Sequence, residues 1–246
     1  MTSSINTLDN SNNHSFTNKV RLSALVPVYN ESETIEEIVR RLEQISIIRQ
    51  IVVVDDGSLD ETPAIVKRLS DEGRVVAYFH ERNYGKGAAL RHALELAKED
   101  YLVIQDADLE YDPRDYATLL EPIKEGIADV VYGSRFMGGS HRVTMFWHMV
   151  ANRMLTFMTN ILYNTILTDM ETGYKVFRRE VLDGMVLHAN SFDFEPEFTA
   201  KILKRKFRIF EVQITFNPRD YTEGKKIKLH DAFEAVWTLI KYRFME

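Results

Sequence analysis

Short apolar runs alternate with segments of helical periodicity between residues 22 and 134. One run, Ile51-Val52-Val53-Val54, is an unbroken series of β-branched residues, which is typical of a strand covered on both faces. Strands that alternate with helices through short connections pair in parallel and are joined by right-handed crossovers. The sequence therefore predicts an α/β fold with a mostly parallel central sheet flanked by helices, and ligands of such sheets bind beyond the carboxyl ends of the strands.

The expected elements follow from this periodicity. The expected strands are 22–28, 51–54, 75–79, 101–105, 129–133, 174–177 and 207–216. The expected helices are 32–45, 60–69, 86–98, 114–125, 143–167, 195–206 and 231–244. No linker composition separates the two halves, so we expect one domain over residues 20–246. The preceding residues 1–19 are rich in Ser, Asn and Thr and are expected to form a disordered tail.

Composition excludes several classes of site. The chain has 246 residues, no cysteine and a formal net charge of −6. The missing cysteine excludes disulfides, thiolate metal sites and a cysteine nucleophile. The negative charge argues against broad nucleic-acid binding, which needs a basic face. We find no signal-peptide core and no window of about 20 residues apolar enough to span a bilayer, so we expect a cytoplasmic protein.

Three acidic residues follow the expected strand 101–105 at spacings of two: Asp106, Asp108 and Glu110. In an extended backbone alternate side chains point the same way, so these carboxylates would aim at one point. Hard oxygen ligands at a strand end suit Mg²⁺ or Mn²⁺ shared with a substrate phosphate. The alternative is an acidic turn before a helix that Asp112-Pro113 opens.

Polar residues also follow the first two expected strands. Tyr29 and Glu31 could frame a flat heterocycle, although a helix-entry turn capped by Asn30 explains them equally well. Of the adjacent Asp55 and Asp56, one could bond a base or ribose hydroxyl. An Asx turn explains one of these two acids well and both poorly, because adjacent carboxylates repel.

Gly85-Lys86-Gly87 opens the expected helix 86–98. Free N–H groups and a lysine at a helix N-terminus suit an anionic ligand. The spacing is not that of a Walker loop, and a glycine turn without a ligand is the alternative.

Taken in order, these clusters resemble the motifs of family-two glycosyltransferases with the GT-A fold. Within that family the chain is most similar to the polyprenyl or dolichyl phosphate mannose and glucose synthases, over about residues 20–245. The motifs that carry the resemblance are Pro27-Val28-Tyr29-Asn30-Glu31, Val54-Asp55-Asp56-Gly57-Ser58, Gly85-Lys86-Gly87, Asp106-Ala107-Asp108 and Gly133-Ser134-Arg135. The resemblance implies a single GT-A, Rossmann-like domain.

The resemblance also implies roles on the donor side. The residues that would hold the nucleotide-sugar are Pro27, Tyr29, Glu31, Asp55 or Asp56, Lys86 and Ala107. Asp106 and Asp108 would carry Mg²⁺ or Mn²⁺ on the diphosphate, with Glu110 at a position where this branch often has Gln. Arg135 would contact the diphosphate or the sugar.

On the acceptor side, the resemblance places Arg153 where this branch has an arginine for the acceptor phosphate; a solvated helix arginine is the alternative. Glu171 replaces a small polar residue of the family pattern. It is a candidate general base for an acceptor hydroxyl, with Asp169 and Glu195 behind it, or a turn carboxylate. The late loop with Arg219 and Lys225 would close over the departing diphosphate, and without the resemblance it is a basic surface loop.

The expected function is therefore metal-dependent, inverting transfer of a hexose from a GDP-mannose or UDP-glucose type donor to a polyprenyl phosphate. The alternatives are transfer to a soluble glycan or small hydroxyl compound, a sugar-1-phosphate nucleotidyltransferase, and a non-catalytic nucleotide-sugar-binding module. The nucleotidyltransferase would need a glycine-rich loop after the first strand, which this sequence lacks. The apolar stripes of 143–167 and of the Trp237 helix would rest on the inner face of the membrane, pack on the sheet, or join a homodimer.

Overall fold

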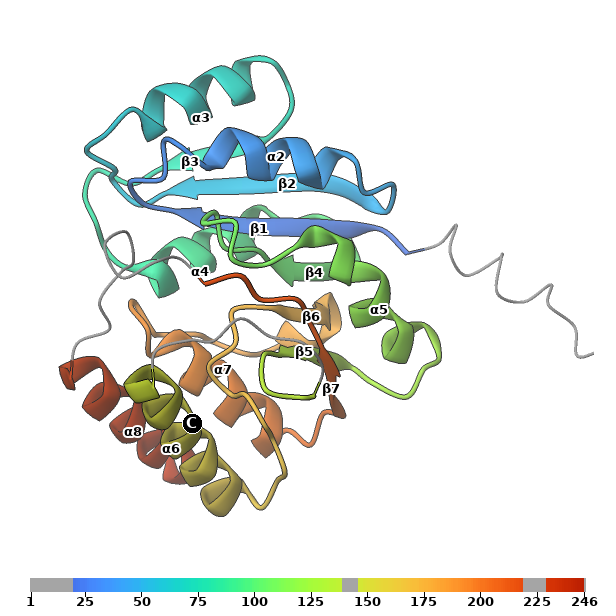
Figure 1. The fold of residues 1–246 in the computed structure, drawn as a ribbon, viewed down its shortest axis with the longest axis vertical. Helices are drawn as coiled ribbons and strands as arrows, with labels where there is room; N and C mark the ends of the chain where they lie inside the picture. The colour runs from blue at the N-terminus through green and yellow to red at the C-terminus, as the bar shows by residue number, and fades with distance from the viewer. Residues whose placement is uncertain (1–19, 139–145, 219–228, 246) are drawn as a thin grey trace, which may run out of the picture.

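A seven-stranded sheet forms the centre of the computed structural model, which describes residues 20–138, 146–218 and 229–245 (Figure 1). The strand order is β3-β2-β1-β4-β6-β5-β7, and only β6 runs antiparallel to its neighbours, β4 and β5. The strands are β1 (Leu22–Val28), β2 (Ile48–Asp55), β3 (Val76–Phe79), β4 (Tyr101–Ile104), β5 (Val130–Ser134), β6 (Lys175–Arg178) and β7 (Ile209–Gln213). The predicted mostly parallel α/β fold is confirmed.

Helices cover both faces of this sheet (Figure 1). They are α2 (Ile35–Glu43), α3 (Thr62–Asp71), α4 (Lys86–Leu96), α5 (Tyr116–Lys124), α6 (Phe146–Tyr163), α7 (Phe194–Lys204) and α8 (Leu229–Phe244). Two short 3₁₀ helices, η1 (Pro113–Asp115) and η2 (Arg179–Leu182), precede α5 and follow β6. Each predicted helix and strand is present, with ends that differ by a few residues. Among the described helices, none is long and apolar enough to cross a membrane.

Alternate strand residues supply two separate cores. Val53 and Val26 face the layer of α2, α3 and α5, whereas Val52 and Leu25 face α4 and α7. This alternation follows from the period of two in a strand, and it explains why the run after Gln50 is apolar on both faces. A third, smaller core lies where α6 and α8 pack together beside α7.

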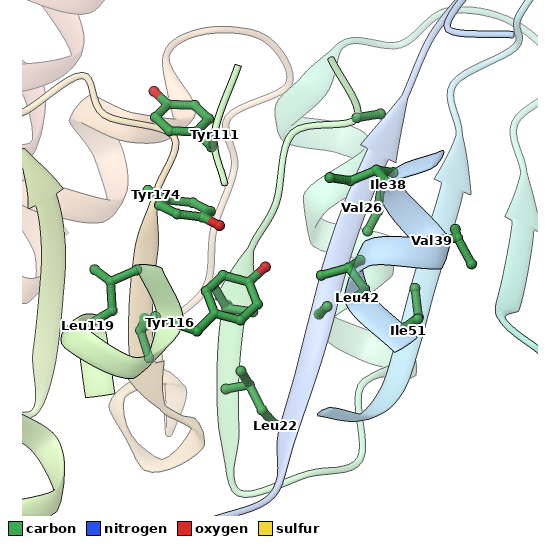
Figure 2. Close-up of a cluster of buried hydrophobic side chains, with 14 of the residues drawn as sticks. Leu22, Val26, Ile38, Val39, Leu42, Ile51, Tyr111, Tyr116, Leu119 and Tyr174 are labelled. Carbon is green, nitrogen blue, oxygen red and sulfur yellow. The ribbon is translucent and has the colours of Figure 1, made fainter. Parts of the chain in front are cut away.

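Three tyrosines, Tyr111, Tyr174 and Tyr116, cluster beside the end of β4 (Figure 2). The rings of Tyr111 and Tyr174 are stacked with centroids 4.8 Å apart, and the Tyr116 ring lies 5.5 Å from that of Tyr174. The hydroxyls of Tyr116 and Tyr174 both donate to Gln105 Oε1, at 2.6 and 2.9 Å. Gln105 is fully buried and directly precedes Asp106, so this cluster fixes the chain where it leaves β4 for the candidate site.

Candidate active site

The carboxyl ends of three parallel strands meet at one edge of the sheet. Val28 of β1 is aligned with Asp55 of β2, and Leu25 of β1 is aligned with Ile104 of β4. The loops that follow these strands therefore lie side by side. The predicted convergence of the polar clusters is confirmed at the level of the backbone.

The loop after β1 is braced by the loop after β2. The backbone N–H of Asn30 donates to Ser58 Oγ at 2.9 Å, and Asn30 Oδ1 accepts from the N–H of Leu59 at 2.8 Å. Asn30 has a φ of 54°, a left-handed conformation that asparagine tolerates better than most residues. Tyr29 and Glu31 on either side of this turn are partly exposed, and their contact with a nucleoside stays a prediction.

Asp55 and Asp56 differ in what they hold. Asp55 Oδ1 accepts from the N–H and the hydroxyl of Ser58, at 3.1 and 2.5 Å, which is the Asx turn expected for one acid. Burial raises the pKa of Asp55. Asp56 instead accepts from the N–H groups of Tyr84 and Gly85, at 2.9 and 2.7 Å. The two carboxylates thus point to different loops, which relieves the repulsion expected between adjacent acids.

The N-terminus of α4 lies under a second loop. The N–H of Ala88 donates to the carbonyl of Asn190 at 3.1 Å, and a Cβ on Gly85 or Gly87 would collide with the backbone at 189–190. This close approach, together with a φ of 104° at Gly85, requires glycine. The carbonyl of Asn190 therefore accepts one of the N–H groups at this helix end, and binding of an anion there stays a prediction.

Lys86 turns its side chain toward the end of β4. Its Nζ lies 2.8 Å from Asp106 Oδ1 and 3.1 Å from Glu195 Oε1. Burial disfavours the charged ammonium, but Asp106 and Glu195 outweigh that effect and raise the pKa of Lys86 above its ordinary value. Lys86 is therefore a fixed cation between two carboxylates of the candidate site.

The extended geometry predicted for the acids after β4 is wrong. Residues 107–110 form a turn in which Leu109 has a φ of 62° and Asp108 Oδ1 accepts from the N–H of Glu110 at 3.1 Å. In the part of the chain that the structure describes, no three acids or histidines are grouped to hold a metal ion. Asp106, Asp108 and Glu110 therefore do not form a three-carboxylate cage here.

The donor chemistry at this turn still fits a hard divalent cation. Mg²⁺ is usually held by one or two carboxylates plus substrate phosphates rather than by an all-protein cage. Asp106 and Asp108 supply carboxylate oxygens at the strand end, and Gly173 leaves room for Asp106 Oδ2, which a Cβ at that position would meet. The neighbouring Ala107 is buried and belongs to the core on the side of α2 and α5.

Arg135 is fixed by Asp169. Its Nε and Nη2 each donate to a carboxylate oxygen of Asp169 at 2.7 Å, and its backbone N–H donates to the same carboxylate at 3.0 Å. Asp169 is fully buried and also accepts from Asn152 Nδ2 at 3.1 Å. The planar, bidentate pair sets the orientation of the guanidinium, which lies 5.3 Å from the Phe216 ring. Arg135 is thus preorganised rather than mobile.

Glu171 and the fully buried Lys175 influence each other electrostatically, and their pKa values approach each other. Burial and the nearby Glu195 raise the pKa of Glu171 to about 8. Burial lowers the pKa of Lys175 to about 8, although Glu195 and Glu171 oppose that shift. Glu171 Oε1 and Glu195 Oε2 are buried without a hydrogen-bond partner in the described structure. An acid such as Glu171, with an unsatisfied buried oxygen and a shifted pKa, is typical of functional sites.

Sequence reasoning missed Lys175. Its Nζ donates to the carbonyls of Met170 and Thr172 and lies 4.5 Å from the centroid of the Tyr132 ring. The available signal was a lysine inside the apolar run 174–177, where a charged side chain must be buried and compensated.

The remaining predicted residues differ in burial, and two of them lie outside the described residues. Pro27 is buried in β1, next to β2. Arg153 is exposed on α6, and its guanidinium lies 5.7 Å from the Phe136 ring, the same distance as that of Arg135 from this ring. Both arginines therefore contact one aromatic side chain after β5. Arg219 and Lys225, like the predicted tail 1–19, lie outside the described residues.

Residues 23–185 match a family described as "Glycosyl transferase family 2". The chain is 32% identical over 214 residues to polyprenol monophosphomannose synthase of Mycolicibacterium smegmatis, covering 83% of this chain and 80% of that protein. It is 30% identical over 213 residues to glycosyltransferase AglD of Haloferax volcanii. That alignment covers 83% of this chain but 34% of AglD, so the chain spans about a third of that relative.

A solved structure has the same fold. Glucosyl-3-phosphoglycerate synthase from Mycobacterium tuberculosis, in complex with Mn²⁺, uridine diphosphate and phosphoglyceric acid, superposes with a TM-score of 0.72 and 20% identity. The match covers 94% of this chain and 81% of that one. At this identity the likeness supports the fold.

Proposed function

Because the chain belongs to glycosyl transferase family 2, we propose that it transfers a hexose from a nucleotide-sugar to a polyprenyl phosphate, with inversion and with a divalent metal. The observation that carries the proposal is the cluster of Lys86, Asp106, Glu195 and Glu171 at the carboxyl end of β4. Preorganised charges beyond the strand ends suit a reaction in which a diphosphate leaves.

On the donor side, the nucleoside would lie against the loops after β1 and β2. Pro27, Tyr29 and Glu31 would contact it from the first loop, and Asp55 or Asp56 from the second. Asp106 and Asp108, with Glu110 next in the turn, would hold Mg²⁺ or Mn²⁺. The bound ion would neutralise charge on the diphosphate.

In the reaction the acceptor oxygen attacks the anomeric carbon from the side opposite the nucleoside diphosphate. The new C–O bond forms as the bond to the diphosphate oxygen breaks, and the electron pair leaves with the diphosphate. Arg135 is held by Asp169 before the substrate arrives, so its charge needs no reorientation. Arg219 and Lys225 would add charge from the late loop. Loss of one such contact raises the barrier by about 2.7–4 kcal/mol in comparable sites.

The state of Glu171 favours a phosphate acceptor. A carboxyl group with a pKa of about 8 carries a proton at neutral pH, so it does not repel an incoming phosphate. A polyprenyl phosphate already has an anionic nucleophile and needs no base. Arg153 is exposed on α6, and its guanidinium would attract that phosphate.

A second candidate acceptor is a hydroxyl group on a glycan or small molecule. The observation in its favour is the same pKa of about 8, because a general base works best when its pKa is near the operating pH. In that case Glu171 would take the hydroxyl proton as the oxygen attacks. A non-catalytic nucleotide-sugar module would leave these buried charges without a use.

A lipid acceptor would account for the exposed apolar stripes on two neighbouring helices. α6 and α8 lie side by side (Figure 1), and each presents large apolar side chains to solvent. The exposed residues are Phe146, Trp147, Val150, Met154, Phe157 and Ile161 on α6, and Phe233, Trp237 and Phe244 on α8. Such aromatic-rich stripes suit peripheral contact at the cytoplasmic face of a membrane, and a second copy of the chain is the alternative occupant.

The test is a transfer assay that compares a polyprenyl phosphate with the same polyprenol lacking phosphate. GDP-mannose and UDP-glucose are each supplied with Mg²⁺ or Mn²⁺, and the lipid product is identified by mass. We expect transfer to the phosphate lipid alone, and loss of transfer in excess chelator. Transfer to the unphosphorylated lipid or to soluble sugars, or turnover that ignores the chelator, would overturn the proposal.

A further inference from the structure

A chain of three side chains runs from the loop after β2 to the middle of α4. Asp56 Oδ1 lies 2.6 Å from His80 Nδ1, and His80 Nε2 lies 2.5 Å from His92 Nδ1. Asp56 and His80 are buried, with 3% and 8% of their surface exposed. Neither histidine belongs to the motifs that identify the family, and the proposed chemistry does not use them.

The carboxylate of Asp56 fixes the direction of this chain. A carboxylate accepts hydrogen bonds, so His80 must carry its proton on Nδ1. In a neutral His80 ring Nε2 is then the acceptor, and the proton between the two rings belongs to His92 Nδ1. The imidazole of His80 is therefore held in one tautomer from both sides.

Asp56 connects His80 to the turn that precedes Lys86. Its oxygens accept three bonds in all: one from His80, and one each from the N–H groups of Tyr84 and Gly85. These two residues form the turn that leads directly into Lys86, whose ammonium pairs with Asp106. A side chain that orients Asp56 thus orients the residue that contacts the proposed metal-binding acid.

Two tyrosine rings pack against the histidine rings, and a cavity lies beside them. The Tyr84 ring meets His80 edge-on at 5.3 Å, and the Tyr78 ring lies 4.6 Å from that of His92. The cavity of about 530 Å³ beside them is also lined by Glu81 and Arg91, the charged groups that face the pair from the end of β3 and from α4. Arg91 is held by Asn190 Oδ1 at 2.5 Å, so it does not replace His92 as the partner of His80.

We propose that His80 and His92 are positioning residues for binding of the nucleotide-sugar. They orient Asp56, which fixes the Tyr84–Gly85 turn and so positions Lys86 beside Asp106. The kinetic test of this inference rests on the proposed function, whereas the structural tests do not require turnover. The pair acts through Asp56 and does not touch the reacting atoms. Its loss should therefore weaken donor binding more than it slows the chemical step.

The experiment compares His80→Leu, His80→Asn and His92→Phe with the wild-type chain. An asparagine at 80 keeps an N–H donor near the Nδ1 position, so it should restore most of what the leucine variant loses. We expect His80→Leu to raise the donor KM about 10- to 100-fold with little change in kcat, by analogy with other orienting residues. His92→Phe should raise KM less. His148→Leu, an exposed histidine change on α6, is the matched control.

Two readouts do not depend on catalysis. Nitrogen NMR of the wild-type rings should show His80 protonated at Nδ1. Hydrogen exchange should show the amides of Tyr84 and Gly85 protected in the wild type and in His80→Asn, and less protected in His80→Leu. If His80→Leu does not fold, His92→Phe is compared with His80→Asn and with wild type for the same donor KM and amide protection.

The outcomes separate the two proposals. Failure of transfer with intact tautomer and exchange results would overturn the proposed function and leave the positioning role standing. An unprotonated Nδ1 on His80 would overturn the positioning role. Equal loss of kcat and kcat/KM, or unchanged amide protection in the folded variants, would also overturn it.

Discussion

The ammonium of Lys86 lies 2.8 Å from the carboxylate of Asp106, so a charge pair joins the start of α4 to the end of β4. Both side chains are largely buried, with 16% and 19% of their surface exposed. Glu195, at the start of α7, shares the same ammonium at 3.1 Å. One lysine therefore neutralises acids from two elements that meet at the candidate site.

Removing this lysine should destabilise the fold. Lys86→Met would leave Asp106 and Glu195 without the ammonium that pairs with both. Breaking a buried ion pair by removing one partner costs about 3–5 kcal/mol. Urea unfolding followed by circular dichroism measures the difference from wild type.

The matched control is Lys67→Met. Lys67 pairs with Asp71 at 2.8 Å on the surface of α3, where both side chains are about two-thirds exposed. Exposed pairs of this kind contribute about 0–1 kcal/mol. Equal losses for the two methionine variants would show that Lys86 does not neutralise a buried cluster.

Asp108→Ala should abolish metal-dependent turnover and leave the fold intact. Asp108 lies half-buried in the turn after β4, and its carboxylate accepts a bond from the N–H of Glu110 in the same turn. We expect the rate to fall by about 10²-fold or more, as for other groups that stabilise transition-state charge. Asp71→Ala, an exposed acid on α3, is the control. Full activity of the Asp108 variant would contradict its assignment as a metal ligand.

The sheet and the positions of the polar loops could be predicted from sequence because they depend on short-range patterns. Short apolar runs predicted β1, β2 and β4, and the acids that follow these strands lie at one sheet edge. The place of β6 could not be read in this way. It runs antiparallel between β4 and β5, a pairing set by the long excursion through α6 rather than by its own residues.

Within the site, the contacts that sequence could not supply join residues far apart in the chain. The pairing of Arg135 with Asp169 spans 34 residues, and that of Asp56 with Gly85 spans 29. The turn at Leu109 also gave no signal, because a left-handed leucine has no sequence signature. The exposed face of α8 was clear as an apolar stripe, yet periodicity alone cannot say whether such a stripe is covered.

Stability should fall as pH rises from about 5 to 8, in part because of Glu171. The unfolded side chain has an ordinary pKa of 4.5, whereas the folded one has a pKa of about 8. Between these values the folded state binds more protons than the unfolded state. The contribution of Glu171 is therefore fully present below pH 4.5 and is lost as pH rises through about 8.

Urea unfolding at several pH values checks this. Glu171→Gln cannot ionise, so its stability should depend less on pH over this range than that of wild type. Glu180→Gln, an exposed glutamate after β6, should keep the wild-type slope. Identical slopes for wild type and Glu171→Gln would show that Glu171 is not held protonated.

The same Glu171→Gln variant decides between the two acceptor classes. Glutamine resembles the protonated acid in shape and charge, so transfer to a phosphate acceptor should persist at close to the wild-type rate. Transfer to a hydroxyl acceptor would lose its general base, which contributes about 10²–10⁴-fold. Rates with each acceptor are measured at saturating donor. A loss of 10²-fold or more with the polyprenyl phosphate, on the scale set by general-base catalysis, would reverse the assignment.

Contact with a membrane should depend on the exposed tryptophans of α6 and α8. Trp147 and Trp237 are 76% and 64% exposed, on helices that pack against each other. Burying a large apolar side chain contributes about 1.5–3 kcal/mol, so the double change to alanine should weaken vesicle binding by tenfold or more. Sedimentation with anionic phospholipid vesicles measures this, and Phe210→Ala, an exposed aromatic change on β7, is the control. If the double variant instead converts a dimer to a monomer and binds vesicles as the wild type does, the stripes are an interface between two copies of the chain.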